Sequence, residues 1–138
     1  MAKLSEKIQA ELDNIIQVLA EINKIKDKKK STAELAGLAT FLHNFYSGIE
    51  NILNQILKEK TITIVKSDSW HKDLLKISFE NNIINEDLKI RLTAYLGFRH
   101  FFVHAYGFML RENDIKNLTE KTEEVFKDFS DSISKYCV

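Results

Sequence analysis

Apolar residues recur every three or four positions along most of this chain, the spacing that places them on one face of an α-helix. One such stripe runs through residues 4–22 and a second through residues 35–56. Ser31 and Glu34 stand just before the second stripe with the spacing of a capping box, in which each side chain accepts a hydrogen bond from the other residue's backbone N–H. The pattern therefore predicts a first helix along the first stripe and a second helix over residues 32–59.

Three more helices are predicted in the second half of the chain. The third is short and begins at Asp68 or Ser69, either of which can cap it. Asn85 can cap the fourth, and Gly107 is its predicted end, because glycine is favoured just beyond a helix C-terminus. The fifth helix is predicted from about residue 113 onward, on an apolar stripe of its own.

Residues 61–65 read like a β-strand, but no other segment of the chain could pair with them. We therefore interpret them as an extended connector. Proline is absent and there are four glycines, which are too few for the tight turns of a sheet protein of this size. The predicted fold is all-α: residues 1–138 form a single five-helix bundle, with four long helices and one short one.

Composition and charge narrow the classes of function. Twenty basic and twenty acidic residues cancel, so any contact with nucleic acid must come from a local patch or an assembled cleft. The lysine-rich run at residues 24–30 is such a patch in one interpretation and a solvated helix end and loop in the other, which we favour. The single cysteine, Cys137, excludes an intrachain disulfide, and no segment resembles a signal peptide or a membrane span. We expect a soluble, cytoplasmic protein that does not associate with membranes.

The fourth predicted helix carries the side chains with the most chemistry: Arg99, His100, His104 and Tyr106. At about 100° of rotation per residue, Arg99 and Tyr106 share a stripe, whereas His100 and His104 stack on another face. Arg99 and His104 diverge by about 140° on a straight helix, so they converge only if the arginine curls round, the helix ends nearby or a second subunit contributes. Arg99 also falls on the apolar stripe, where an unpaired charge is costly, so it needs an acidic partner, a cleft or a subunit interface.

These side chains suit the metal-free cleavage of RNA. His104 can take the proton of a ribose 2′-hydroxyl, which then attacks the adjacent phosphate, and Arg99 can hold the phosphate oxygens. The leaving 5′-oxygen needs a proton, for which His100 or His104 of the partner subunit is a candidate. Tyr106 can orient the phosphate, donate a proton or accept a modification. A symmetric dimer around the fourth helix would supply the convergence that one copy lacks.

The spacing Arg99-x4-His104-x-Tyr106 resembles the R-x4-H-x-Y signature of HepT-like toxins in the HEPN superfamily. His100 fills a slot in which asparagine or aspartate is more usual. The resemblance implies a homodimer that cuts RNA in a shared cleft, without a metal or a cofactor. It also implies an MNT-type nucleotidyltransferase as the antitoxin, which would transfer AMP to Tyr106, where an RNA phosphate would otherwise lie.

Two other interpretations stay open. His100 and His104 have the i, i+4 spacing of a metal site, for which His43 or His71 would have to supply a third ligand. Alternatively, the chain is a non-catalytic HEPN module that binds a nucleotidyltransferase or presents substrate to it. Phenylalanines also flank the motif on several faces, and we predict that some of them form the dimer interface: Phe98, Phe101, Phe102 and Phe108.

Overall fold

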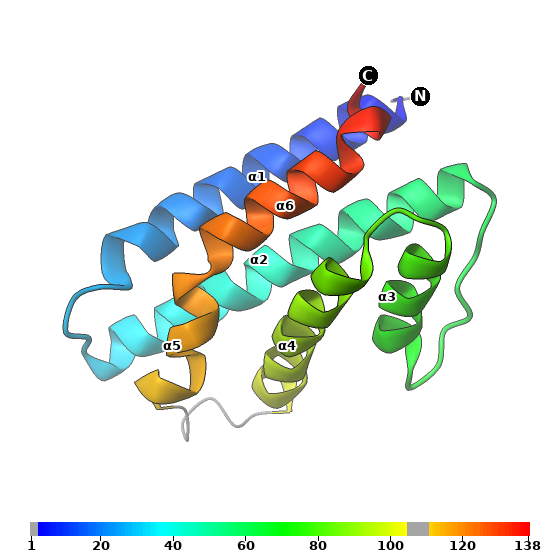
Figure 1. The fold of residues 1–138 in the computed structure, drawn as a ribbon. Coiled ribbons are helices and arrows are strands. Elements are labelled where there is room, and N and C mark those ends of the chain that lie inside the picture. Colours follow the sequence, from blue (N-terminus) through cyan, green and yellow to red (C-terminus); the bar gives the residue numbers. More distant parts are fainter. Residues whose placement is uncertain (1–2, 105–110) are drawn as a thin grey trace.

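The computed structural model describes residues 3–104 and 111–138. Within these ranges the chain forms six α-helices and a short 3-10 helix, with no strand, and the helices pack into one bundle (Figure 1). The prediction of an all-α bundle is confirmed, and no helix in these ranges is long and apolar enough to cross a membrane. In chain order the helices are α1 (Leu4–Ile25), α2 (Thr32–Glu59), α3 (Trp70–Glu80), α4 (Glu86–Val103), α5 (Glu112–Glu120), α6 (Thr122–Ile133) and η2 (Ser134–Cys137).

Helices α1 and α2 form an antiparallel hairpin (Figure 1). The two helices approach closely at Gly48, where an added Cβ would lie 2.7 Å from Cγ1 of Ile15. A larger residue at Gly48 would therefore push α1 away from α2. The predicted stripe of the first helix is confirmed by the buried side chains of α1: Ile8, Leu12, Ile15, Leu19 and Ile22.

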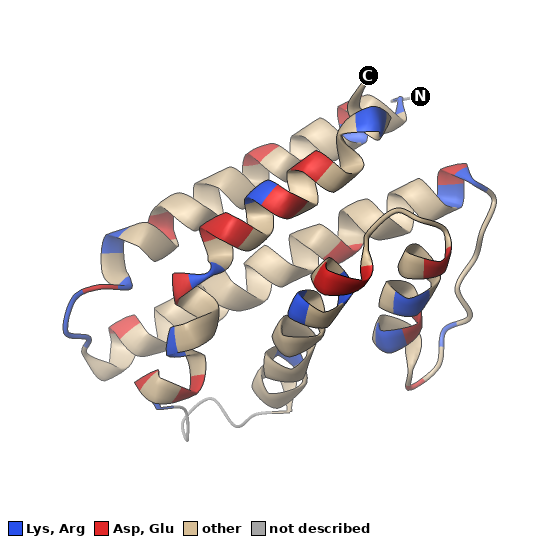
Figure 2. Cartoon of the chain, viewed as in Figure 1, with Lys and Arg blue, Asp and Glu red and all other residues tan. Residues whose placement is uncertain are grey.

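Helix α2 is the central helix of the bundle. It contacts α1, α3, α4 and α5, and its middle is largely uncharged, whereas α6 carries acidic and basic residues along its length (Figure 2). Its predicted range and its predicted cap are both confirmed. The Ser31 hydroxyl accepts a hydrogen bond from the Glu34 N–H at 3.1 Å, and the Glu34 carboxylate accepts one from the Ser31 N–H at 3.0 Å. A cap of this kind stabilises a helix by about 1 kcal/mol.

Helices α3 and α4 form a second antiparallel hairpin, which packs on α2 (Figure 1). Thr61 turns the chain with a φ of 60°, and residues 62–65 form no helix and pair with no strand in the described ranges. Ile64 among them is buried. The predicted connector therefore starts one residue later than expected. Ser69 precedes α3 as predicted, but its hydroxyl donates to Asp73 and does not cap the helix. Asn82 turns the chain toward α4 with a φ of 60°, which asparagine tolerates better than most residues.

Helix α4 begins where the sequence predicts and ends earlier. Asn85 caps it, since its Oδ1 accepts a hydrogen bond from the Leu88 N–H at 2.8 Å. The helix ends at Val103, and His104 follows as its C-terminal cap residue. Gly107, the predicted end, lies outside the described residues. His104 therefore stands where the helix stops, whereas Arg99 and His100 lie in its last turns.

The predicted fifth helix is in fact two helices, so the predicted count of five is wrong. The chain leaves helical geometry at Lys121, where φ is −100° and ψ is 2°. The hydroxyl of Thr119 donates to the carbonyls of Ile115 and Lys116, at 3.1 and 2.9 Å. The hydroxyl of Thr122 donates to the Thr119 carbonyl at 3.0 Å. Hydroxyls that bond to nearby carbonyls weaken a helix locally, but the apolar stripe continues across the break and does not reveal it.

The lysine-rich run is less solvated than predicted. The side chain of Lys30 is 3% exposed, and its ammonium contacts the Glu112 carboxylate at 2.5 Å and the carbonyls of Lys26 and Lys28. Lys28 forms an ion pair with Glu34. The prediction of a solvated loop is wrong for Lys30, because this side chain joins the α1–α2 loop to the start of α5.

Candidate functional site

The candidate site lies at the C-terminal end of α4. His100 stands in the last turn of the helix, and the N–H of His104 donates to the His100 carbonyl at 3.3 Å. The centroids of the two imidazole rings are 4.3 Å apart, and both side chains are exposed. The prediction that these histidines share one face is confirmed. Tyr106, the last residue of the predicted motif, lies outside the described residues.

Arg99 lies on a different face of α4 from the histidine pair. Its side chain is half-buried, on the side of the helix that also buries Leu92 and Tyr95. Its Nε is buried and donates no hydrogen bond to any described residue, and no carboxylate among those residues forms an ion pair with its guanidinium. The N–H groups of Arg99 are therefore not committed to an acidic residue in the described part of the bundle.

A buried carboxylate lies on the helix that α4 packs against. Glu50 of α2 is 5% exposed, and Nδ1 of His71, near the start of α3, lies 3.0 and 2.9 Å from its two oxygens. Tyr46, one turn earlier on α2, is buried, and its hydroxyl has no hydrogen bond with the described residues. Burial raises the pKa of Tyr46, the charge of Glu50 raises it further, and the charge of Arg99 lowers it. We call these four side chains the Glu50 cluster: Tyr46, Glu50, His71 and Arg99.

Three members of the Glu50 cluster are missing from the predicted site residues: Tyr46, Glu50 and His71. A signal for one of them was present in the sequence. Glu50 lies between Ile49 and Ile52 on the apolar stripe of α2, where a charged residue is as unexpected as Arg99 is on α4. Opposite charges on the apolar faces of two helices predict that those faces meet. His71 carried no comparable signal, since only the folded chain brings α3 to α2.

A groove between α3 and α4 extends along the same side of α4 as the histidine pair. On α4, Lys89 and Thr93 fall within about 60° of His100 and His104 in helical rotation. No lysine of the groove forms an ion pair with a described residue, although the ammonium of Lys89 lies 5.2 Å from the centroid of the Phe79 ring. The groove has a volume of about 410 Å³ and is lined by Lys72, Asp73, Leu75, Lys76, Lys89 and Thr93.

Comparison with known proteins shows which family the chain belongs to. Residues 37–138 match the sequence model of a family described as "HepT-like protein". The chain belongs to the HepT-like family. Among solved structures, the cytosolic protein of unknown function YutE from Bacillus subtilis has a similar fold, with a TM-score of 0.74 at 17% sequence identity over 95% of this chain and 88% of that chain. No curated protein matches the chain.

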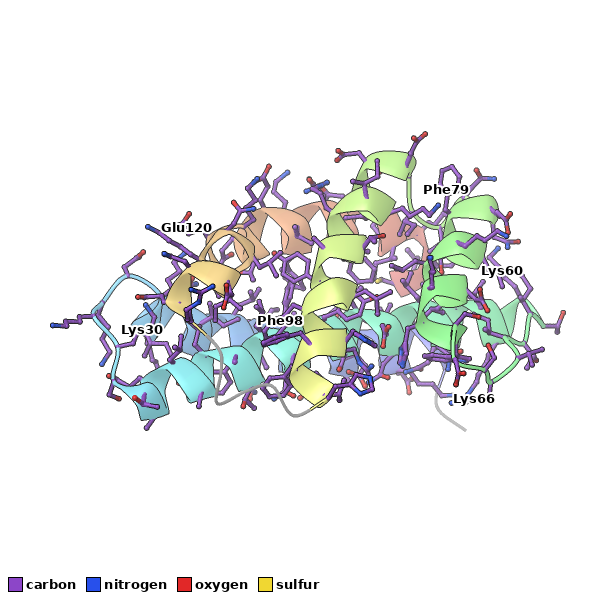
Figure 3. The ribbon with its side chains drawn as sticks, turned by 90° about the horizontal axis from the view of Figure 1, so that it is seen from below. Lys30, Lys60, Lys66, Phe79, Phe98 and Glu120 are labelled. Carbon is purple, nitrogen blue, oxygen red and sulfur yellow. The ribbon has the colours of Figure 1, made fainter. Side chains whose placement is uncertain are left out.

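The phenylalanines beside the site of this HepT-like chain differ in their exposure. Phe98 is 8% exposed and lies between α4 and α5 (Figure 3), and its ring centroid is 5.7 Å from that of Phe102. The ring centroid of Phe102 in turn lies 5.2 Å from that of His43 on α2, in a tilted arrangement. These two phenylalanines need no second surface, because α2 and α5 cover that side of α4 (Figure 3). That some of the four phenylalanines form a dimer interface stays a prediction. Phe101 is half-buried, and Phe108 lies outside the described residues.

No described residue of this HepT-like chain supplies the third ligand that a metal site at His100 and His104 would need. Residues 3–104 and 111–138 contain no group of three or more metal-ligating side chains. His71 contacts Glu50, and His43 packs on Phe102, so neither of them completes a site with the histidine pair at the end of α4. The arrangement suits proton transfer by imidazoles, and a guanidinium with uncommitted donors lies on another face of the same helix end.

Proposed function

We propose that this HepT-like protein is a metal-independent endoribonuclease toxin, restrained by a nucleotidyltransferase that transfers AMP to Tyr106. One observation carries the proposal: two exposed histidines with adjacent rings lie at the helix end that also bears an arginine held by no carboxylate of the described residues. A guanidinium in that state keeps its planar set of donors for phosphate oxygens. Membership of the HepT-like family supports the same activity, because that family is associated with toxins that cleave RNA.

The proposed reaction needs two imidazoles in opposite protonation states. Neutral His104 takes the proton from a ribose 2′-hydroxyl, and the 2′-oxygen attacks the adjacent phosphorus. The bond from phosphorus to the 5′-oxygen breaks, and that oxygen receives a proton from a charged imidazole, either His100 or His104 of the partner subunit. Arg99 offsets the negative charge that builds up on the phosphate oxygens. The products are a 2′,3′-cyclic phosphate and a free 5′-hydroxyl.

The proposed enzyme is a symmetric homodimer through α4. Beside the histidine face, Ile90 is 62% exposed, Ala94 is exposed, and a Cβ added at Gly97 would meet nothing within 4 Å. Two copies of α4 crossing at Ala94 and Gly97 would approach closely and cover both copies of Ile90. Each site would then gain His104 of the partner subunit, which removes the need for Arg99 and His104 of one helix to converge.

The lysines of the α3–α4 groove offer a path for the RNA backbone. Lys72 and Lys76 of α3 face Lys89 across the groove, and the exposed face continues from Lys89 to His104. These last two residues are 15 positions apart, which corresponds to about 22 Å of helix, long enough to support several nucleotides. Ammonium groups outside ion pairs attract phosphates without reading the bases. The proposal therefore expects weak sequence preference from this groove.

Tyr106 is the proposed point of control. It follows Arg99 by seven positions in the chain. AMP on its hydroxyl would place a phosphate anion and a bulky nucleoside where the RNA phosphate is held, and the anion would neutralise Arg99. The partner that the proposal requires is an MNT-type nucleotidyltransferase.

The test combines intact mass with RNA cleavage. The protein is purified after expression alone and together with its co-encoded nucleotidyltransferase, and each form is incubated with RNA in EDTA. We expect cleavage by the unmodified form, and an added mass of AMP on Tyr106 with loss of cleavage in the other. His104→Ala should abolish cleavage, whereas His43→Ala is the matched control, since His43 lies on α2 and packs on Phe102.

The outcome that contradicts the proposal is a folded, unmodified dimer that leaves RNA intact. In that case the non-catalytic module that binds a nucleotidyltransferase becomes the better account. Cleavage that survives His104→Ala but is abolished by EDTA would contradict the metal-independent mechanism.

A further inference from the structure

Glu50 is a buried carboxylate, which a helix with a purely structural role does not need. It lies in the middle of α2 and is 5% exposed, and it is the one carboxylate among the buried residues of the described chain. An ionised carboxylate loses its hydration there, so it must be compensated by hydrogen bonds and by positive charge. The Glu50 cluster supplies both, from two other helices.

His71 supplies the hydrogen bond. Its Nδ1 lies 3.0 and 2.9 Å from the two oxygens of Glu50, and since a carboxylate can only accept, Nδ1 carries the proton. The imidazole also packs edge-on against Trp70, with ring centroids 4.8 Å apart. His71 is therefore fixed on both sides, and Glu50 is held on the side of α3.

Arg99 supplies the positive charge without closing an ion pair. Helices α2 and α4 pack together, and Arg99 lies on the buried side of α4. The two helices meet one turn before Arg99: the ring centroids of Phe45 on α2 and Tyr95 on α4 are 5.5 Å apart, and Arg99 follows Tyr95 by four positions on the same face. Tyr46 is the neighbour of Phe45, and its pKa is raised by the charge of Glu50 and lowered by the charge of Arg99. Within the described residues Arg99 forms no ion pair, and Nδ1 of His71 lies within hydrogen-bonding distance of both oxygens of Glu50.

We propose that Glu50 is the positioning residue for Arg99: its charge, fixed by His71, holds the guanidinium between α2 and α4 and leaves the N–H groups of Arg99 free for substrate phosphate. The catalytic part of this inference rests on the proposed ribonuclease function. Helix α3 thereby has a role outside the Arg99-x4-His104-x-Tyr106 motif, since it carries His71, the histidine that keeps Glu50 from pairing with Arg99.

The first measurement follows Arg99 directly and does not depend on cleavage. The chain has three arginines, Arg91, Arg99 and Arg111, so a 15N spectrum of the guanidinium groups contains three Nε–Hε signals, which single substitutions assign. Glu50→Gln keeps the size and one acceptor of the side chain and removes its charge. We expect it to move the Arg99 signal and speed its exchange with water, and to leave the Arg91 and Arg111 signals in place.

The second measurement is RNA cleavage by the same variants. We expect Glu50→Gln to lower kcat by about 10- to 100-fold, the cost of a misplaced catalytic group, with a smaller change in KM. Glu50→Asp, which keeps the charge, should recover part of the rate, and it serves as the second variant if Glu50→Gln does not fold. The matched control is Glu59→Gln, an exposed carboxylate on the same helix.

The outcomes separate the inference from the function it rests on. If the Arg99 signal is unmoved in folded Glu50→Gln, the inference is wrong, whatever happens to the rate. If the signal moves and cleavage is unchanged, Glu50 holds Arg99 without any catalytic role, and the positioning claim is wrong. If the wild-type chain cleaves no RNA, the proposed function fails, while a shifted Arg99 signal still supports the control of Arg99 by Glu50.

Discussion

Two arginines on α4, eight positions apart, show how one helix can use the same side chain in two ways. Arg91 donates to Asp87 on its own helix at 2.9 Å and to Asp128 on α6 at 2.8 Å. Arg99 is half-buried against α2 and forms no ion pair with any described residue. The two carboxylates raise the pKa of Arg91, against the lowering effect of its partial burial. Arg91 thus ties α4 to α6, whereas Arg99 forms no ion pair with a described residue.

The difference lies in what the facing helix supplies. Helix α6 offers Asp128 at a half-exposed position, where the carboxylate can turn to meet Arg91. Helix α2 offers Glu50 at a buried position, with Nδ1 of His71 within hydrogen-bonding distance of both of its oxygens. Arg91 forms ion pairs with two carboxylates through Nη2, and these neutralise its charge, although its Nε and Nη1 have no hydrogen-bond partner among the described residues. A charge that is held in place but not paired is available to a ligand, which is the property that a phosphate-binding residue needs.

The largest expected effect separates the two arginines in catalysis. Arg99→Ala should lower the rate of RNA cleavage by about 10²- to 10³-fold, the usual loss when one donor to a charged transition state is removed. Arg99→Lys should also be poor, because a lysine cannot offer a planar pair of donors. Single-turnover cleavage of a labelled RNA measures both variants. Arg91→Ala is the control and should cleave RNA at a rate within about twofold of the wild type. Equal losses of rate at Arg91 and Arg99 would contradict the difference between the two arginines.

A smaller effect is expected from the lysines of the α3–α4 groove. The double charge reversal Lys72→Glu with Lys76→Glu should weaken binding of a single-stranded RNA by about tenfold or more. It should also reduce the slope of log K against log salt by about 0.7 for each RNA phosphate that the variant no longer neutralises. Fluorescence anisotropy of an RNA bound to the inactive His104→Ala protein measures this. Lys7→Glu, on exposed α1, is the control, and an unchanged slope in the double variant would show that RNA does not follow the groove.

The third effect concerns stability and is expected at Arg91. Arg91→Met removes the cation between Asp87 and Asp128, and the free energy of unfolding should fall by about 1 kcal/mol, since both carboxylates remain substantially exposed to solvent. Urea titration followed by circular dichroism measures the change. Replacing both aspartates by asparagine in the same variant should recover most of the loss. If it does not, Arg91 acts through its packing and not through its charge.

The smallest effect is at another fully paired charge, Glu34 in the capping box of α2. Hydrogen bonds from the Lys28 side chain and the Ser31 backbone lower the pKa of Glu34 from 4.5 to about 2. A carboxyl group whose pKa is lower in the folded state stabilises the fold above its unfolded pKa, and this contribution is lost as the pH falls. We therefore expect unfolding free energies of the wild type and Glu34→Gln to differ most above pH 4.5 and to converge toward pH 2. Curves that stay parallel across this range would contradict the pairing.

Local patterns in the sequence predicted most of the fold. The capping box at Ser31 and Glu34 and the cap at Asn85 have their predicted partners, because these bonds join residues three positions apart and need no tertiary contact. The break at Lys121 was missed, because the hydroxyls that cause it, on Thr119 and Thr122, do not interrupt the apolar period. For the site, helical rotation alone correctly placed His100 above His104.

The sequence by itself determined which residues share a face of each helix, because a side chain's direction follows from 3.6 residues per turn. It therefore placed Arg99 on the buried side of α4 and showed that its charge needed a partner. Only the tertiary structure decided which charged side chains lie on the helices that α4 packs against, because Glu50 and His71 are 49 and 28 positions away in the chain and reach this side of α4 through the packing of three helices. The same packing turns the carboxylate of Glu50 to His71, which leaves the guanidinium of Arg99 without an ion pair among the described residues.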